Sequence, residues 1–199
     1  MNRSGEENRS VRNTKRRLRE GLLRLLEQKP INEISVKELT ELVDVNRGTF
    51  YFHYQDIYDL LRSMEDEFFE QFDLRLSDEP AELPQETAAL PKEGFPYLRG
   101  VFSFLGQNRD FCRIMLGAHG DMKFVERVKR RVDSQCRRFW QILAPGADEL
   151  RYVMYNAFII NGCIGMIQEW LSDSRGLTAD DVAALTATIV LESVVPSTS

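Results

Sequence analysis

Residues 41–56, ELVDVNRGTFYFHYQD, constrain the fold more than any other part of the chain. The stretch is typical of the end of one helix, a sharp turn and a very short second helix. Positions 50–54 of this second helix carry four aromatic rings and an imidazole in succession. These rings cannot all point into a small core, so some of them must face outward.

Helical geometry separates the inward rings from the outward ones. At 100° per residue Phe50 and Tyr54 fall together, and we expect both to pack against the preceding helices. The opposite face and its flanks carry small, polar and aromatic groups: Arg47, Gly48, Thr49, Tyr51, Phe52 and His53. An outward phenylalanine marks an interface, and the surrounding cation, hydroxyl, phenol and imidazole can reach phosphate oxygens and base edges. The spacing predicts a helix-turn-helix, although an ordinary corner between two helices with partly buried aromatics fits it too.

The overall charge does not favour a nucleic-acid partner, but its distribution does. The 199 residues carry a net charge of −5, whereas residues 1–63 hold twelve Lys and Arg against ten Asp and Glu and are net positive. Six cations occur between positions 9 and 19 with no acid among them: Arg9, Arg12, Lys15, Arg16, Arg17 and Arg19. A basic end on an acidic body can bind DNA because the local field at the phosphates decides the contact.

A 3.6-residue spacing of apolar residues runs through the chain and predicts an all-α protein of about nine helices. Ser35 and Glu38 form a predicted capping box, and Asn46, Asp56 and Thr178 are predicted caps of later helices. The expected helices are 10–28, 35–43, 47–53, 56–76, 95–107, 109–117, 121–143, 148–172 and 178–194. Residues 77–93 hold three prolines and five acids, which predicts a mobile loop or a lid.

Two stretches of the sequence resemble a known protein family. Residues 14–61, from TKRRLREGLL through SVKEL and VNRGTFYFHY to DIYDLL, resemble the DNA-binding domain of TetR-type transcriptional regulators. Residues 152–171, YVMYNAFIINGCIGMIQEWL, look like the penultimate helix of a subgroup of that family. The resemblance implies a flexible basic arm at 1–9, a helix-turn-helix domain at 10–56, and an effector-binding and dimerisation domain at 57–199.

The resemblance also implies a role for each residue of the motif. Ser35 and Lys37 are expected to touch the DNA backbone. The bases are expected to be read at Arg47, Gly48 and Thr49. The phosphates are expected to be held by Tyr51 and His53, and a thymine methyl to be contacted by Phe52. One position departs from the family, because many members carry a phosphate-contacting lysine where this chain has Ile57.

The remaining two thirds are expected to form a homodimer and to bind a small molecule. Helix 148–172 is apolar nearly all round, which a monomer surface does not tolerate. The predicted dimer residues are Phe158, Gly162, Gly165, Trp170, Val182, Leu185 and Ile189. The predicted effector-site residues, which ordinary core packing would also explain, are Phe68, Phe72, Phe102, Phe111, Met115, Trp140, Tyr155 and Phe158.

These features together predict a cytoplasmic, ligand-responsive repressor that binds double-stranded DNA with a palindromic operator. We expect no membrane partner and no cofactor. We also expect no metal site, since the three cysteines are widely spaced and no C-x-x-C occurs. No catalytic constellation is visible, so the chain is not expected to be an enzyme. Two alternatives stay open: a co-regulator acting through a partner protein, and a thiol-switched regulator using Cys112.

Overall fold

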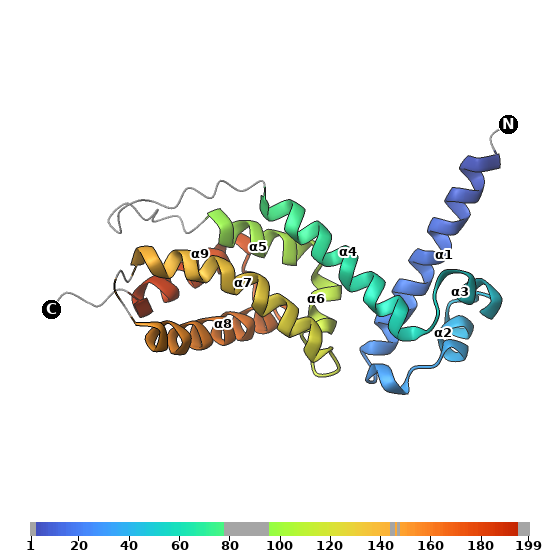
Figure 1. Ribbon diagram of the computed structural model, residues 1–199. Helices are drawn as coiled ribbons and strands as arrows, with labels where there is room; N and C mark the ends of the chain where they lie inside the picture. Colours follow the sequence, from blue (N-terminus) through green and yellow to red (C-terminus); the bar gives the residue numbers. More distant parts are fainter. Residues whose placement is uncertain (1–2, 78–95, 144–145, 147, 195–199) are drawn as a thin grey trace. The chain divides into compact units, whose positions relative to one another are not determined.

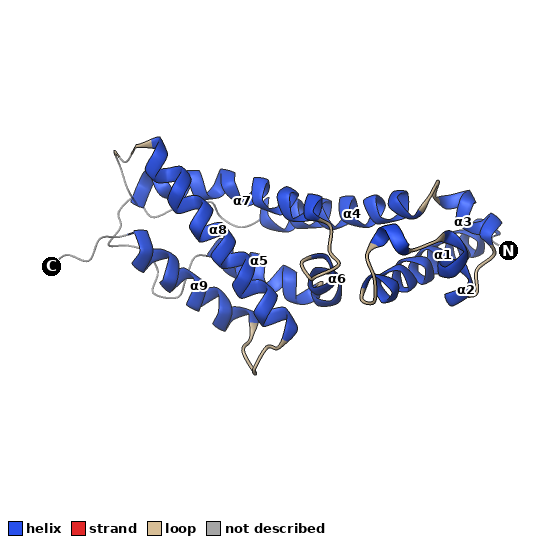
Figure 2. Ribbon diagram, turned by 90° about the horizontal axis from the view of Figure 1, so that it is seen from below, coloured by secondary structure: helices blue, strands red, loops and turns tan. Residues whose placement is uncertain are grey.

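The computed structural model describes residues 3–77, 96–143, 146 and 148–194, and over these residues it is helical (Figures 1 and 2). A short 3-10 turn, η1, covers Ile31–Glu33. The α-helices of the described residues are α1 (Arg3–Leu26), α2 (Val36–Leu42), α3 (Arg47–His53), α4 (Ile57–Ser77), α5 (Pro96–Gln107), α6 (Arg109–Met115), α7 (Met122–Leu143), α8 (Glu149–Ser172) and α9 (Ala179–Val194). The predicted all-α class and the predicted number of helices are confirmed.

Two segments of the chain differ from the prediction or lie partly outside the described residues. Of the predicted arm at 1–9, residues 3–9 lie in α1, which begins at Arg3 and not at residue 10 as expected. Residues 3–17 contain no leucine, so the spacing of apolar residues gave no signal for a helix there. Of the predicted loop at 77–93, residue 77 ends α4 and residues 78–93 lie outside the described residues.

The chain divides into two compact units, and the division falls within α4. The first unit holds residues 1–70 together with the short segment 117–120, and the second holds the remaining residues. The first unit therefore contains α1, α2, α3 and the beginning of α4. The second contains the end of α4 and helices α5 to α9.

The core of the first unit is small and aliphatic, with one ring inserted from α3. The buried side chains of α1 are Leu18, Leu22, Leu25 and Leu26, spaced so that they share one face. They meet Leu39 of α2, Phe50 of α3 and Leu60 of α4, all of which are fully buried. Because one stripe of each helix supplies this core, the opposite faces of α1 and α3 are left for solvent or a partner.

Helix α1 approaches α2 closely at Gly21. A β-carbon built on Gly21 would overlap Cγ1 of Val43 and would lie 2.9 Å from Cδ1 of Leu39. The missing side chain thus lets two helices touch through backbone and methyl groups. This contact fixes α2, and through it the turn that leads to α3.

The beginning of α2 is capped in part as expected. Ser35 accepts a hydrogen bond from the Glu38 amide at 3.2 Å, as the capping box requires. The second half of the box differs, because the Glu38 carboxylate pairs with Lys29 Nζ at 2.7 and 2.8 Å instead of returning to Ser35. An ammonium group at this distance attracts a carboxylate more strongly than a neutral amide does.

In the second unit Trp170 of α8 organises the core. Its ring packs edge-on against Phe102 of α5, with centroids 5.8 Å apart, and its indole N–H donates to the Leu177 carbonyl at 3.1 Å. Arg109 of α6 stacks over the ring and donates to the Trp170 carbonyl at 2.9 Å. Helices α5, α6 and α8 and the turn before α9 thus meet at one indole.

Candidate nucleic-acid interface

The turn between α2 and α3 is held by α1. Asp44 adopts a left-handed conformation, with φ of 49°, which reverses the chain after α2. Arg17 of α1 donates to the Asp44 carbonyl at 3.1 Å and also to the carbonyl of Val43. A guanidinium group thereby satisfies carbonyls that the end of a helix leaves without partners. The sequence pattern did not single out Arg17 for this role, because the contact spans 26 residues of chain.

Helix α3 presents its rings as the helical angles predict. Phe50 is fully buried and Tyr54 nearly so, while Phe52 on the opposite face is 81% exposed. Tyr51 is exposed beside it, and its ring meets Phe50 edge-on at 5.5 Å between centroids. Phe50 and Tyr54 therefore anchor the helix. Tyr51 packs on Phe50, and both Tyr51 and Phe52 stay exposed to solvent.

The beginning of α3 is capped and exposed. Asn46 caps the helix by accepting from the Gly48 amide at 2.7 Å. Arg47 and Gly48 are exposed and Thr49 is half-buried. A β-carbon on Gly48 would lie 3.2 Å from Asn46 Oδ1. Glycine therefore leaves the cap undisturbed, and it places no side chain on the exposed surface of the helix.

Ser35 and Lys37 lie on the exposed side of α2. Lys37 is within 3.9 Å of Glu41, and both side chains are largely exposed, so the pair is weak. Both residues border an open groove of about 540 Å³ between the end of α1 and α2. Its lining residues are Arg24, Leu25, Glu27, Gln28, Ser35, Lys37, Glu38, Glu41 and Leu42. Three carboxylates against two cations give this groove no attraction for phosphate.

His53 lies at the end of α3, beside the outward-facing residues Arg47, Thr49, Tyr51 and Phe52. Its imidazole stacks edge-on with Phe52 at 5.0 Å between centroids. Partial burial lowers the pKa of His53 below its usual value, and the positive charge of Lys15 lowers it further. The side chain is therefore neutral at pH 7 in the protein without DNA. Lys15 belongs to α1, so α1 passes close to His53 at the end of α3.

The residues predicted for an effector site are mostly core residues. Phe68, Phe72, Phe102 and Met115 are buried, whereas Phe111 and Tyr155 are partly exposed and Phe158 is exposed. The side chain of Trp140 lies outside the described residues. Among the described groups several rings pair edge-on, including Phe72 with Phe104 and Phe111 with Phe124. Plain packing accounts for these rings, and an effector would have to displace or adjoin them.

The residues predicted for a dimer interface separate into two sets. Phe158, Gly162, Gly165, Leu185 and Ile189 are exposed. Trp170 and Val182 are buried inside their own chain and do not belong to this exposed face. The exposed face of α8 extends further along the helix, to Leu150 and Met154.

By length and composition α8 could cross a membrane, and only 11% of its most apolar window is buried within the chain. Its opposite side packs on its own chain through Tyr152, Ile160, Ile167, Trp170 and Leu171. A β-carbon on Gly162 or Gly165 would meet no atom within 4 Å. The helix is thus apolar on a side that its own chain leaves open.

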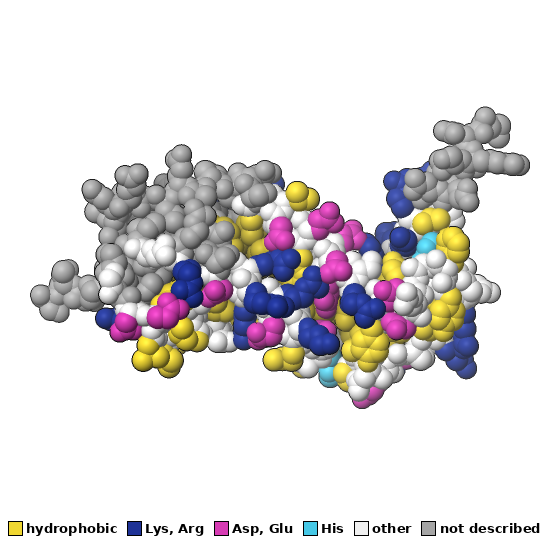
Figure 3. All heavy atoms as spheres, in the orientation of Figure 1, with side chains coloured by type: hydrophobic (Ala, Val, Ile, Leu, Met, Phe, Trp, Pro, Cys, Tyr) yellow, Lys and Arg dark blue, Asp and Glu magenta, His cyan; other side chains and the backbone are white. Residues whose placement is uncertain are grey.

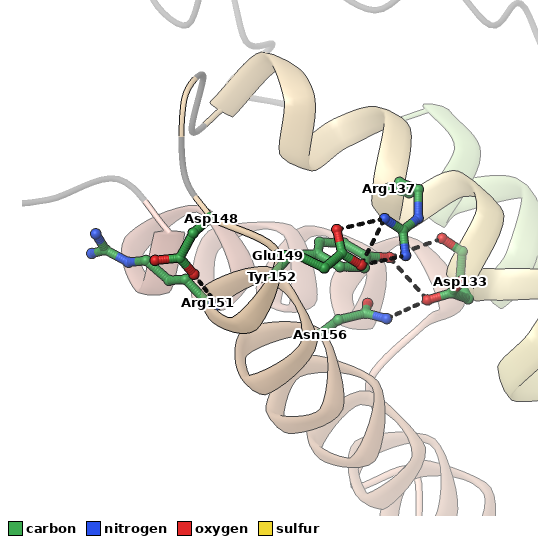
Figure 4. A network of polar contacts seen from close by, with 7 residues as sticks. All are labelled: Asp133, Arg137, Asp148, Glu149, Arg151, Tyr152 and Asn156. Carbon is green, nitrogen blue, oxygen red and sulfur yellow. Dashed lines mark hydrogen bonds and ion pairs between the residues drawn. The ribbon is translucent and has the colours of Figure 1, made fainter.

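A polar network fixes the orientation of this face (Figure 4). Asp133 of α7 accepts hydrogen bonds from the Tyr152 hydroxyl at 2.9 Å and from the Asn156 amide of α8. Arg137 pairs with Glu149 at 3.1 Å and stacks over the Tyr152 ring at 4.2 Å. Two turns of α8 are therefore tied to α7 on one side, which turns Leu150, Met154 and Phe158 outward. The sequence analysis missed Asp133, because an isolated acid on a basic helix carries no local signal.

The cysteines do not favour a thiol switch. Burial raises the pKa of the Cys112 thiol to about 12 and that of Cys163 to about 11. A thiol with such a pKa is protonated at pH 7, and the thiolate is the reactive form. In the described part of the chain no group of three or more His, Cys, Asp or Glu could hold a metal ion.

Comparisons with known proteins give the family. A family model of the TetR type, described as a transcriptional regulator C-terminal region, matches residues 93–191. No curated protein sequence matches the chain. Among solved structures, a TetR transcriptional regulator from Streptococcus agalactiae 2603V is similar, with a TM-score of 0.62 at 20% identity, covering 94% of this chain and 98% of that one.

Two further structures share the fold at lower identity. A TetR-like transcriptional regulator from Rhodococcus sp. RHA1 has a TM-score of 0.62 at 13% identity, covering 88% of this chain and 92% of that one. The regulator FadR from Bacillus subtilis, solved in complex with stearoyl-CoA, has a TM-score of 0.57 at 11% identity, covering 88% and 97%. With the helical fold and the matching C-terminal region, the chain belongs to the TetR family of transcriptional regulators.

Proposed function

We propose that the protein is a cytoplasmic, ligand-responsive repressor that binds a palindromic operator as a homodimer and is released by a small molecule. The exposed surface of α3 is the observation that supports this proposal. It places Arg47, Thr49, Tyr51 and His53 around an 81% exposed Phe52, on a helix whose inward residues are buried. Such a surface gives donors for phosphates and base edges, together with an apolar contact for a thymine methyl.

The homodimer rests on the open apolar face of α8 and α9. A dimer would cover Phe158, Leu185 and Ile189, which the single chain leaves in water. It would also bring two copies of α3 to one side of the DNA, where successive major grooves lie about 34 Å apart. An effector that alters this spacing would release the operator. FadR from Bacillus subtilis, which has a similar fold, was solved in complex with stearoyl-CoA.

Selection of genomic DNA fragments by the purified protein tests the repressor proposal. We expect a palindromic fragment to be enriched and its affinity to fall steeply with salt. Thr49→Ala and Tyr51→Ala should each weaken binding about tenfold or more, because each loss is repeated in both half-sites. Leu74→Ala, at an exposed apolar position outside α3, is the control and should bind normally.

A folded dimer that selects no sequence above random DNA at low salt would overturn this proposal. It would instead favour the co-regulator alternative, in which the protein acts through a partner protein. A pull-down with the folded dimer as bait would then be compared with the same experiment on Phe52→Ala.

Binding should take up protons at His53. The pKa of His53 is lowered in the protein by burial and by Lys15, and a nearby phosphate would raise it again. Affinity should therefore increase as pH falls from 8 toward 6, by up to about tenfold per pH unit for each proton taken up. In His53→Gln this dependence should flatten, as measured by fluorescence anisotropy across the pH range. An unchanged pH profile in the variant would show that His53 does not approach the phosphates.

Protein stability should follow the opposite trend with pH. The lowered folded-state pKa means that the unfolded chain binds the proton more readily. Below the unfolded pKa of about 6.5 the His53 contribution to stability is therefore lost as pH falls. Binding measurements must stay at pH values where the protein remains folded.

A further inference from the structure

Helix α1 is longer than the core that it serves. It begins at Arg3, yet Leu18 is its first buried leucine, and no side chain described between positions 9 and 17 is buried. Packing therefore accounts for the second half of the helix and not for the first. The first half also carries Arg9, Arg12, Lys15 and Arg16, with no acid between positions 9 and 19.

The structure sorts these cations into two groups. Arg17 and Arg19 serve the protein itself: Arg17 donates to the carbonyls that end α2, and Arg19 pairs with Glu67 of α4. The cations that remain are Arg9, Arg12 and Arg16, which are exposed, and Lys15, which is half-buried. Arg16 contacts Glu20 and Asn13, but the ion pair with Glu20 is largely exposed and contributes about 1 kcal/mol or less.

The outward cations begin at the edge of the α3 surface. Lys15 is close enough to His53 for its charge to act on the imidazole. From Lys15 to Arg9 the helix rises by about 9 Å, at about 1.5 Å per residue, away from α3. Lys and Arg side chains can be followed along α1 in Figure 3. Positive charge on α1 thus lies next to the α3 surface.

The rest of the motif is poor in cations. Helices α2 and α3 together carry Lys37 and Arg47. The start of α4 offers none, because Ile57 is buried in the core and Asp56 and Asp59 surround it. Arg62 on the next turn pairs with Asp59 at 3.4 Å. The outward cations of α1 therefore exceed those of the two motif helices.

We infer that the DNA-binding surface includes the exposed half of α1, where Arg9, Arg12, Lys15 and Arg16 contact the phosphate backbone beyond each half-site. The inference rests on the proposed operator binding and deepens it. Phosphate is the expected partner because long, exposed cations on one helix face suit backbone oxygens, and such contacts carry no sequence information.

The test compares Arg9→Gln/Arg12→Gln/Lys15→Gln with wild type on the selected operator. Glutamine keeps a helix propensity close to that of the cations, so α1 is retained. Each lost phosphate contact should reduce the slope of log affinity against log salt by about 0.9, in each of two protomers. We therefore expect a slope less steep by about 5 and weaker binding at low salt. The ratio of operator to random-DNA affinity should stay the same.

A control removes the same charge from another place. Arg75→Gln/Lys123→Gln/Arg130→Gln changes three exposed cations of the second unit. It should leave the salt slope unchanged. Hydroxyl-radical footprints should show protection lost at the flanks of the operator in the α1 variant and kept in the control. Shortening the flanks should weaken wild type and leave the α1 variant unaffected.

The outcomes separate the inference from the proposed function. If the α1 variant binds the operator with the wild-type slope and footprint, the inference is wrong and operator binding stands. If the control flattens the slope equally, net charge is responsible and the inference is again wrong. If wild type selects no operator, the proposed function fails and the inference fails with it.

Discussion

Phe158→Asp is expected to convert the protein from dimer to monomer and to reduce operator affinity by a factor of about a thousand or more. Phe158 is 70% exposed in the single chain, so the change costs little in the monomer fold. In a dimer the new carboxylate would be buried against its own copy, and burying an unpaired charge costs several kcal/mol. A monomer then contacts one half-site and loses the contribution of the second. Sedimentation gives the mass and anisotropy gives the affinity.

Met122→Asp is the matched control for this experiment. Met122 is also 70% exposed, but it begins α7 and lies outside the α8 and α9 face. It should remain dimeric. Gly162→Leu provides a second variant, because nothing within 4 Å of the glycine in the single chain opposes a side chain. If Phe158→Asp and Gly162→Leu both stay dimeric and bind DNA, the interface lies elsewhere.

Gly21→Val is expected to unfold the first unit and abolish DNA binding while the second unit stays folded. The β-carbon alone would overlap Val43 Cγ1 and press on Leu39. Val43 is β-branched and has few rotamers with which to move aside. Overpacking of this kind costs about 3 kcal/mol, which is a large share of the stability of a small helical unit. Thermal unfolding followed by circular dichroism should show an early helical transition.

Glu20→Val introduces the same side chain one residue earlier, at an exposed position. It carries the helix-propensity cost of valine without the collision, so it should lower stability by about 1 kcal/mol or less. Gly21→Ala should fall between the two. Equal melting curves for Gly21→Val and Glu20→Val would show that α1 and α2 do not pack closely at this point.

Several features were predictable because they depend on residues close in sequence. The caps at Ser35, Asn46 and Asp56 each use a side-chain oxygen that accepts from an amide two or three residues later. The inward and outward residues of α3 follow from 100° per residue, and the buried Phe50 with the exposed Phe52 confirms that geometry. For the same reason the predicted helices agree closely with the observed ones, apart from the beginning of α1.

Other features depended on which helix packs across from which. Trp170 and Val182 were grouped with Phe158 by their apolar character, but the neighbouring helices α5 and α6 cover Trp170 and leave Phe158 open. Composition does not distinguish an apolar residue that is buried within its own chain from one that the chain leaves exposed. The tie from Asp133 to α8 and the use of Arg17 to end α2 belong to the same class.

The sequence by itself determined the helices, their caps and the outward ring of α3, because hydrogen bonds and periodicity within a few residues decide them. Only the tertiary structure decided how the cations of α1 are divided, with Arg17 and Arg19 turned to the protein and Arg9, Arg12 and Arg16 turned to solvent. It also decided which apolar residues of α8 remain exposed. Both outcomes depend on contacts between residues far apart in the chain, where side chains of the same type meet different neighbours.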